Sequence, residues 1–94
     1  MYTKSDLSSI DSEYFTVISV NAFHVTLQSK NTRHDWYILS REDRVHGKVI
    51  RTCMIYHRHN RRDGFHPHGS ASTLADAMNK IKEHDTYFLN RRTK

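Results

Sequence analysis

The 94-residue sequence has little cysteine, proline or glycine: one Cys, one Pro and three Gly. A lone cysteine, Cys53, cannot form an intramolecular disulfide, which argues against a small secreted scaffold stapled by several bridges. The scarcity of proline and glycine argues against a disordered chain or a flexible linker. The composition therefore favours a folded domain that relies on an ordinary hydrophobic core.

Long apolar runs are also missing. No stretch approaches the roughly 20 apolar residues that a membrane-spanning helix requires. The first residues, MYTKSDLSSIDSEY, contain no apolar segment of the kind found in a signal peptide. We therefore expect a cytoplasmic protein with no membrane partner.

The chain is long enough for one hydrophobic core, and its patterns predict a single α+β domain over residues 1–94. We expect an antiparallel sheet of three to four strands with one amphipathic C-terminal helix on one face, and a short N-terminal helix is compatible with the sequence. The predicted segments are a weakly structured or helical 1–12, strands within 14–59, a His-rich loop at 60–71, the helix at 73–89 and a basic tail at 90–94.

Alternation of side-chain type supports the strands. The segment YFTVISV from Tyr14 is rich in β-branched and aromatic residues, and FHVTLQS alternates apolar with polar residues. The segment DWYILS would place Trp36 and Ile38 on one face, and KVIRTCMIYHRH reads as the longest strand. A turn dipeptide at Asp63-Gly64, followed by proline and glycine, predicts the loop.

The C-terminal helix has the clearest pattern. Leu74, Ala77, Met78, Ile81 and Phe88 recur at spacings of three or four, with one gap that His84 or Asp85 must fill. Thr73 and Asp76 resemble a helix-capping pair. This apolar stripe predicts a helix packed on the sheet in two layers.

Positive charge is concentrated in the middle of the chain. The formal net charge is +5, and residues 30–62 hold nine Lys or Arg against three acidic residues, a net of +6. Basic surfaces attract nucleic-acid phosphates, and arginine can also stack on bases. The candidate nucleic-acid-binding residues are Arg41, Arg44, Lys48, Arg51, Arg58, Arg61 and Arg62, with Arg91, Arg92 and Lys94 as an auxiliary patch.

Two His-X-His pairs flank the Asp63-Gly64 turn: His57 with His59, and His66 with His68. Residues i and i+2 of a strand share a face, so two imidazoles in this spacing can bind one zinc ion. These four histidines are the candidate metal ligands, although they match no recognised zinc-site spacing. The competing interpretation is a set of surface and loop histidines without a metal.

The sequence contains no phosphate-binding loop, dinucleotide fingerprint or GxSxG motif, so we expect no catalytic residues and no cofactor unless the histidines bind zinc. The favoured hypothesis is a small accessory protein, of the kind found in phage or mobile elements, that binds DNA or RNA without catalysis. One alternative is a metal-binding or metal-dependent protein. Another is an interaction module that docks an acidic protein partner. Either a monomer or a homodimer is compatible with the sequence.

Overall fold

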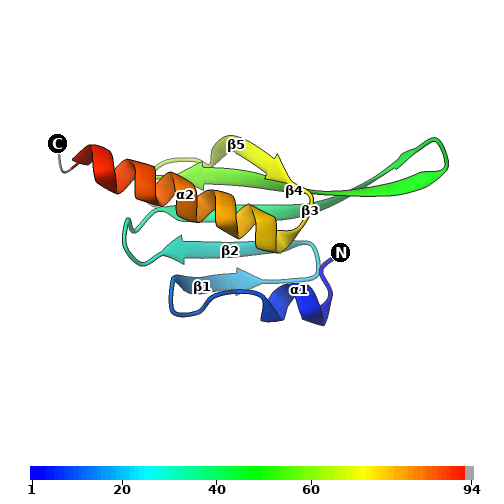
Figure 1. The fold of residues 1–94 in the computed structure, drawn as a ribbon, viewed down its shortest axis with the longest axis horizontal. Coiled ribbons are helices and arrows are strands. Elements are labelled where there is room, and N and C mark those ends of the chain that lie inside the picture. The colour runs from blue at the N-terminus through cyan, green and yellow to red at the C-terminus, as the bar shows by residue number, and fades with distance from the viewer. Residues whose placement is uncertain (93–94) are drawn as a thin grey trace.

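The computed structural model describes residues 1–92 of the chain, and it contains one antiparallel sheet with a helix along one face (Figure 1). The elements are α1 (Lys4–Ser8), β1 (Phe15–Val20), β2 (His24–Ser29), β3 (Asp35–Val45), β4 (Lys48–Arg58), β5 (His66–Ala71) and α2 (Leu74–Arg92). The strands pair in chain order, β1-β2-β3-β4-β5. The α+β class is confirmed, but the predicted three to four strands are too few because the sheet has five.

The additional strand, β5, lies inside the segment that the sequence analysis interpreted as a loop. Pro67 and Gly69 argued against regular structure there, yet β5 pairs with β4 from His57↔His66 to Cys53↔Ala71. Proline lacks the N–H that a central strand needs, but it is tolerated on an edge strand. β5 is such an edge, and its register shifts beside Pro67.

The β3–β4 hairpin is longer than expected and projects beyond the rest of the molecule (Figure 1). Its eleven-residue strands are joined by His46 and Gly47, with φ angles of 52° and 76°. Positive φ at both central residues is the mark of a type I′ turn, whose twist matches that of the flanking strands. β3 continues through the polar residues 41–44 to Val45, and the molecule extends over 49 × 24 × 23 Å.

Helix α2 begins after Thr73, whose hydroxyl oxygen accepts a hydrogen bond of 3.0 Å from the Asp76 backbone N–H. Its apolar stripe is buried against the sheet, as the spacing predicted. The buried members of this core from α2 and the central strands are Val25, Leu27, Trp36, Ile38, Cys53, Ile55, Leu74, Ala77, Met78 and Ile81. In the gap of the stripe, the buried Asp85 carboxylate accepts hydrogen bonds from the hydroxyls of Tyr14 and Thr32.

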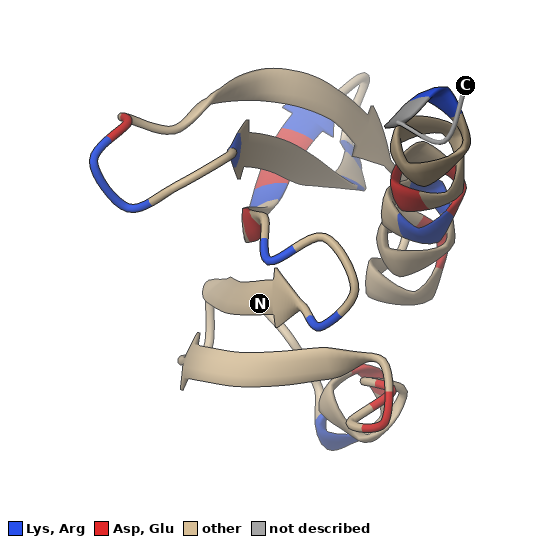
Figure 2. Cartoon of the chain, turned by 90° about the vertical axis from the view of Figure 1, so that its left-hand side faces the viewer, with Lys and Arg blue, Asp and Glu red and all other residues tan. Residues whose placement is uncertain are grey.

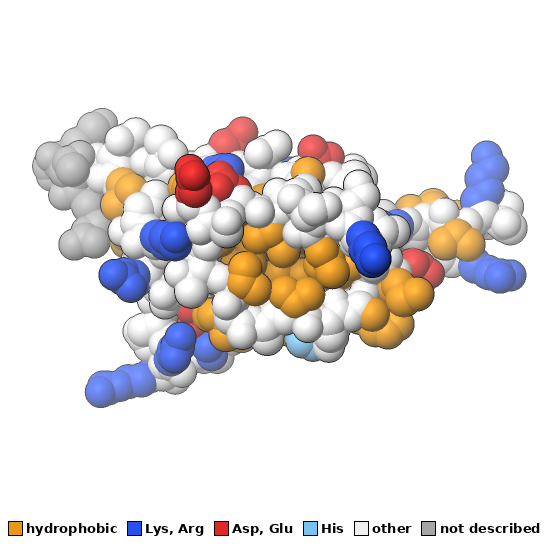
Figure 3. Space-filling model, turned by 90° about the horizontal axis from the view of Figure 1, so that it is seen from below, with side chains coloured by type: hydrophobic (Ala, Val, Ile, Leu, Met, Phe, Trp, Pro, Cys, Tyr) orange, Lys and Arg blue, Asp and Glu red, His pale blue; other side chains and the backbone are white. Residues whose placement is uncertain are grey.

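The N-terminal segment packs beside β1. Thr3 and Asp6 form a reciprocal capping box at the start of α1. The hydroxyl of the buried Tyr2 donates a 3.0 Å hydrogen bond to the Ile38 carbonyl. Figure 3 views the molecule from the side of β1 and α1, and apolar side chains gather in the middle of this surface. β1 is an edge strand that leaves Val17, Ile18 and Val20 exposed.

None of the helices in residues 1–92 has both the length and the apolar character needed to cross a bilayer.

Candidate functional site

Six of the eight histidines gather at one end of the sheet, where α2 lies across the ends of β3, β4 and β5. His34 directly precedes β3, and His57 lies near the end of β4. The register pairs Trp36 with His57 across β3 and β4, and His57 with His66 across β4 and β5. The cluster consists of His34, His57, His59, His66, His68 and His84, connected by ring contacts.

Three of these imidazoles form a compact group, which we call the histidine trio: His34, His57 and His59. One ring nitrogen from each lies within 4.8 Å of the others. His34 Nδ1 and His57 Nε2 are 3.0 Å apart, a hydrogen bond in which one nitrogen carries the proton. The ring of the exposed His59 stacks on His34 with the centroids 4.2 Å apart. His34 and His57 are buried.

Aromatic rings enclose the trio. The indole of Trp36 stacks on His57 at a centroid distance of 4.0 Å, and Phe88 meets His34 edge to face at 4.6 Å. Burial, followed by the charges of neighbouring histidines, lowers the pKa of His57 to about 3. Burial also lowers the pKa of His34, of His68 and of His84. At neutral pH, His34 and His57 therefore present uncharged imidazoles with a lone pair available.

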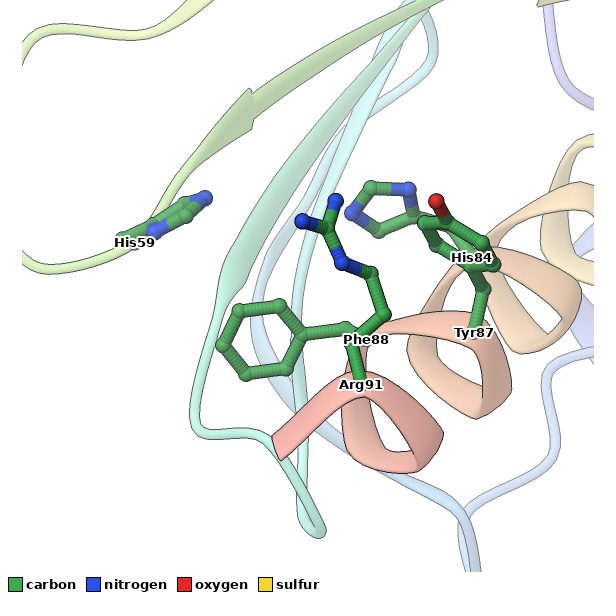
Figure 4. Close-up of a pocket in the computed structure, with 5 residues that line it drawn as sticks. All are labelled: His59, His84, Tyr87, Phe88 and Arg91. Carbon is green, nitrogen blue, oxygen red and sulfur yellow. The ribbon is translucent and has the colours of Figure 1, made fainter. Parts of the chain in front are cut away.

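A pocket of about 340 Å³ adjoins the trio at His59. Its other lining residues, His84, Tyr87, Phe88 and Arg91, come from α2, and Figure 4 shows the Phe88 and Arg91 side chains extending from the helix on the side of His59. Within the described residues, His84 Nε2 is buried and has no hydrogen-bond partner. The cluster thus contains a polar atom that protein groups alone leave unsatisfied.

The structure divides the predicted metal ligands. His57 and His59 lie together, but the third member of the trio is His34, which the sequence analysis did not select. His66 and His68 are outside the trio, although the centroids of both rings lie 5.5 Å from the His57 centroid. His34 lies in no His-X-His pair, so only the pairing of β3 with β4 could reveal it.

The predicted basic residues do not form one patch. Arg41, Arg44 and Lys48 lie on the projecting hairpin, whereas Arg58, Arg61, Arg62 and Arg91 lie near the opposite end (Figure 1), together with the α2 position of Arg92. Lys94 is outside the described residues. Figure 2 looks onto the second end and shows basic segments on the β4–β5 loop, on the β2–β3 loop and at the end of α2. We call this the basic end.

Several of these cations have acidic partners. The Arg51 guanidinium lies 2.8 Å from the Asp6 carboxylate, and Arg41 lies 3.1 Å from Asp43. Arg58 Nε lies 2.9 Å from the buried Asp35 carboxylate, and Arg61 lies 3.9 Å from the same oxygen. Fixed pairing reduces the charge that Arg41, Arg51 and Arg58 offer to a ligand.

The face of the sheet opposite α2 carries an aromatic group that composition alone did not indicate. Tyr37 and Tyr56 are cross-strand partners with centroids 5.9 Å apart, and Phe65 lies 5.9 Å from Tyr37. The Arg58 guanidinium lies over the Phe65 ring at 4.2 Å. Together with Thr26 and Leu39, these four side chains line a shallow hollow of about 590 Å³.

No protein-family model, curated protein or solved structure matches this chain.

Proposed function

We propose that this protein binds single-stranded nucleic acid, without catalysis, on the open face of its sheet. The observation that carries the proposal is the group of Tyr37, Tyr56 and Phe65, which we call the aromatic face. The three rings are half-buried, and they contact one another. Helix α2 does not cover them because it lies on the other face of the sheet (Figure 1).

Aromatic side chains on a water-facing sheet are suited to unpaired bases. Every base has a flat π-face, so stacking tolerates any sequence and contributes about 1–3 kcal/mol for each base. Antiparallel sheets with exposed aromatic residues bind single-stranded RNA in this way. Duplex bases are already stacked and paired, so the aromatic face favours a single strand over a duplex.

Phosphate contacts come from the loop beside this face. Arg58 is held by Asp35 and stacks on Phe65, so it shapes the hollow rather than adding free charge. Arg61 and Arg62 follow directly in the β4–β5 loop, and both are exposed. A strand of nucleic acid lying across Tyr56 and Phe65 would place its backbone near these two guanidinium groups. The overall charge of +5 also favours a polyanion.

The experiment measures binding of a fluorescent oligonucleotide by anisotropy, with single-stranded and duplex forms of the same sequence. We expect tighter binding of the single strand. Tyr56→Leu and Phe65→Leu keep apolar bulk but remove the stacking ring, and each should weaken binding about 5- to 150-fold. Tyr87→Leu removes an exposed ring from α2 and should leave the affinity unchanged.

A pair of double variants tests which basic residues contact the phosphates. The double variant Arg61→Gln with Arg62→Gln should weaken binding. It should also reduce the slope of log affinity against log salt concentration by about 0.7 for each lost phosphate contact. Arg44→Gln with Lys48→Gln removes the same charge from the distant hairpin and should have little effect. Equal losses in both double variants, or binding unaffected by the two ring variants, would contradict the proposal. No binding of either oligonucleotide by the parent protein would favour an acidic protein as the partner.

A further inference from the structure

We propose that the histidine trio binds one transition-metal ion of the Zn²⁺ class through three imidazole nitrogens. This site is independent of the proposed nucleic-acid surface. The trio packs under α2, where His34 and His59 contact Phe88, whereas the aromatic face lies on the other side of the sheet. The two proposals can therefore fail separately.

The positions of the nitrogen atoms are close to what a metal requires. Zinc binds histidine nitrogen at about 2.0–2.1 Å in a tetrahedral arrangement, so two nitrogen ligands on one ion lie about 3.3 Å apart. His34 Nδ1 and His57 Nε2 are 3.0 Å apart. The third nitrogen, from His59, lies within 4.8 Å of both. Because His59 is exposed, its side chain can rotate to complete the group.

The environment also holds two of the ligands in place. The stacked Trp36 ring fixes the plane of His57, and Phe88 packs against His34. Two buried imidazoles that already face each other lose little conformational freedom when a metal binds. Preorganisation of this kind strengthens binding because the ordering cost was met during folding.

The protonation states of His34 and His57 are compatible with metal binding. In the metal-free protein, one of the two facing nitrogens of His34 and His57 carries a proton. A metal needs both lone pairs, so that ring must shift its proton to its other nitrogen. Neutral rings change tautomer and release no proton to solvent. His34 and His57 therefore bind a metal at neutral pH without first losing a proton to solvent.

The donor set selects the class of ion. Imidazole nitrogen suits Zn²⁺, Cu²⁺, Ni²⁺ and Co²⁺, whereas Mg²⁺ and Ca²⁺ prefer oxygen ligands. Three protein ligands leave a fourth tetrahedral position for water. The pocket at His59 gives solvent access to the trio. Water in this pocket would also offer a partner to the buried His84 Nε2, which has none among the described residues.

The test uses untagged protein that has been treated with a chelator and then exchanged into metal-free buffer. Native mass spectrometry and calorimetric titration with Zn²⁺ should show one ion for each chain. Co²⁺ should give the visible absorption of a tetrahedral nitrogen site. Mg²⁺ at the same concentration should not bind.

Matched variants locate the site. His59→Gln changes an exposed ligand and should preserve the fold, as checked by circular dichroism, while lowering zinc affinity at least 10-fold. His34→Gln should do the same and tests the ligand that lies outside the sequence pattern. The double variant His66→Gln with His68→Gln removes the other His-X-His pair and should retain affinity within twofold.

Three results would overturn the proposal. The first is no zinc binding by the parent protein. The second is loss of binding in the His66/His68 variant with retention in His59→Gln. The third is several weak ions for each chain that respond equally to every variant, which would indicate adventitious binding to surface histidines.

Discussion

The two halves of the β3–β4 ladder are built from the same pair of strands, yet their side chains have opposite environments. Toward the basic end, Ile55 is 1% exposed and the polar His57 is only 2% exposed. Toward the hairpin turn of the same strand, and on the same face as Ile55 and His57, the apolar Val49 is 60% exposed. Polarity alone therefore did not decide which residues of β4 became buried.

Coverage by α2 explains the difference. The helix crosses one half of the sheet, and the hairpin projects beyond it (Figure 1). Side chains under the helix are removed from water whatever their type, and buried polar groups then require partners. His57 finds one in His34, whose Nδ1 lies 3.0 Å from the His57 Nε2. On the uncovered half, Arg41 and Asp43 form a pair that stays in contact with water.

The sharpest way to break this comparison is to truncate one apolar residue on the α2 side of β4 in each half. Ile55→Ala creates a cavity under α2 and should lower the free energy of unfolding by about 2–5 kcal/mol. Val49→Ala should cost less than about 1 kcal/mol because its side chain is mostly exposed to water in the folded protein. Urea denaturation followed by circular dichroism measures both. Similar losses would mean that the hairpin is covered in solution, for example by a second copy of the chain.

Ion pairs provide the second comparison. Asp35→Ala leaves Arg58 without its partner at the edge of the core and should destabilise the protein by about 2 kcal/mol. Asp43→Ala removes an exposed pair and should cost between about 0 and 1 kcal/mol. The same denaturation experiment, repeated at high salt, should reduce only the smaller effect. If Asp35→Ala is neutral, the buried pair contributes nothing to the difference between the two halves.

Acid should destabilise the protein through the histidines in the half of the sheet that α2 covers. Because the pKa of folded His57 is about 3 and that of an unfolded histidine is about 6.5, the unfolded chain binds more protons below pH 6.5. Stability present above that pH is therefore lost as the pH falls from about 6.5 toward 3. With chelator present, His57 alone should cost about 1.4 kcal/mol between pH 7.5 and 5.5. The lowered pKa values of His34, His68 and His84 act in the same direction.

Thermal melts across this pH range measure the effect. His57→Gln should flatten the pH dependence, while His46→Asn, at the exposed hairpin turn, should leave it as in the parent protein. A pH dependence that is unchanged in His57→Gln would show that His57 is not its source.

Local pattern was enough to predict much of the fold. The alternation in DWYILS correctly placed Trp36 and Ile38 on one face, which the structure shows to be the buried one, and the stripe from Leu74 to Ile81 correctly predicted the core side of α2. Both features depend only on the period of a strand or a helix. β5 escaped prediction because proline and glycine are local signals of a loop, whereas an edge strand tolerates them when a partner strand is present.

The sequence by itself determined the types of the elements other than β5, the apolar faces and the His-X-His pair at His57 and His59. Only the tertiary structure decided that His34 faces His57, although 23 residues separate them. Only the tertiary structure divided the basic run between two ends and left Tyr37 and Tyr56 on the face of the sheet opposite α2. The reason is physical: periodicity is a property of neighbouring residues, while strand register and helix placement determine which distant side chains meet.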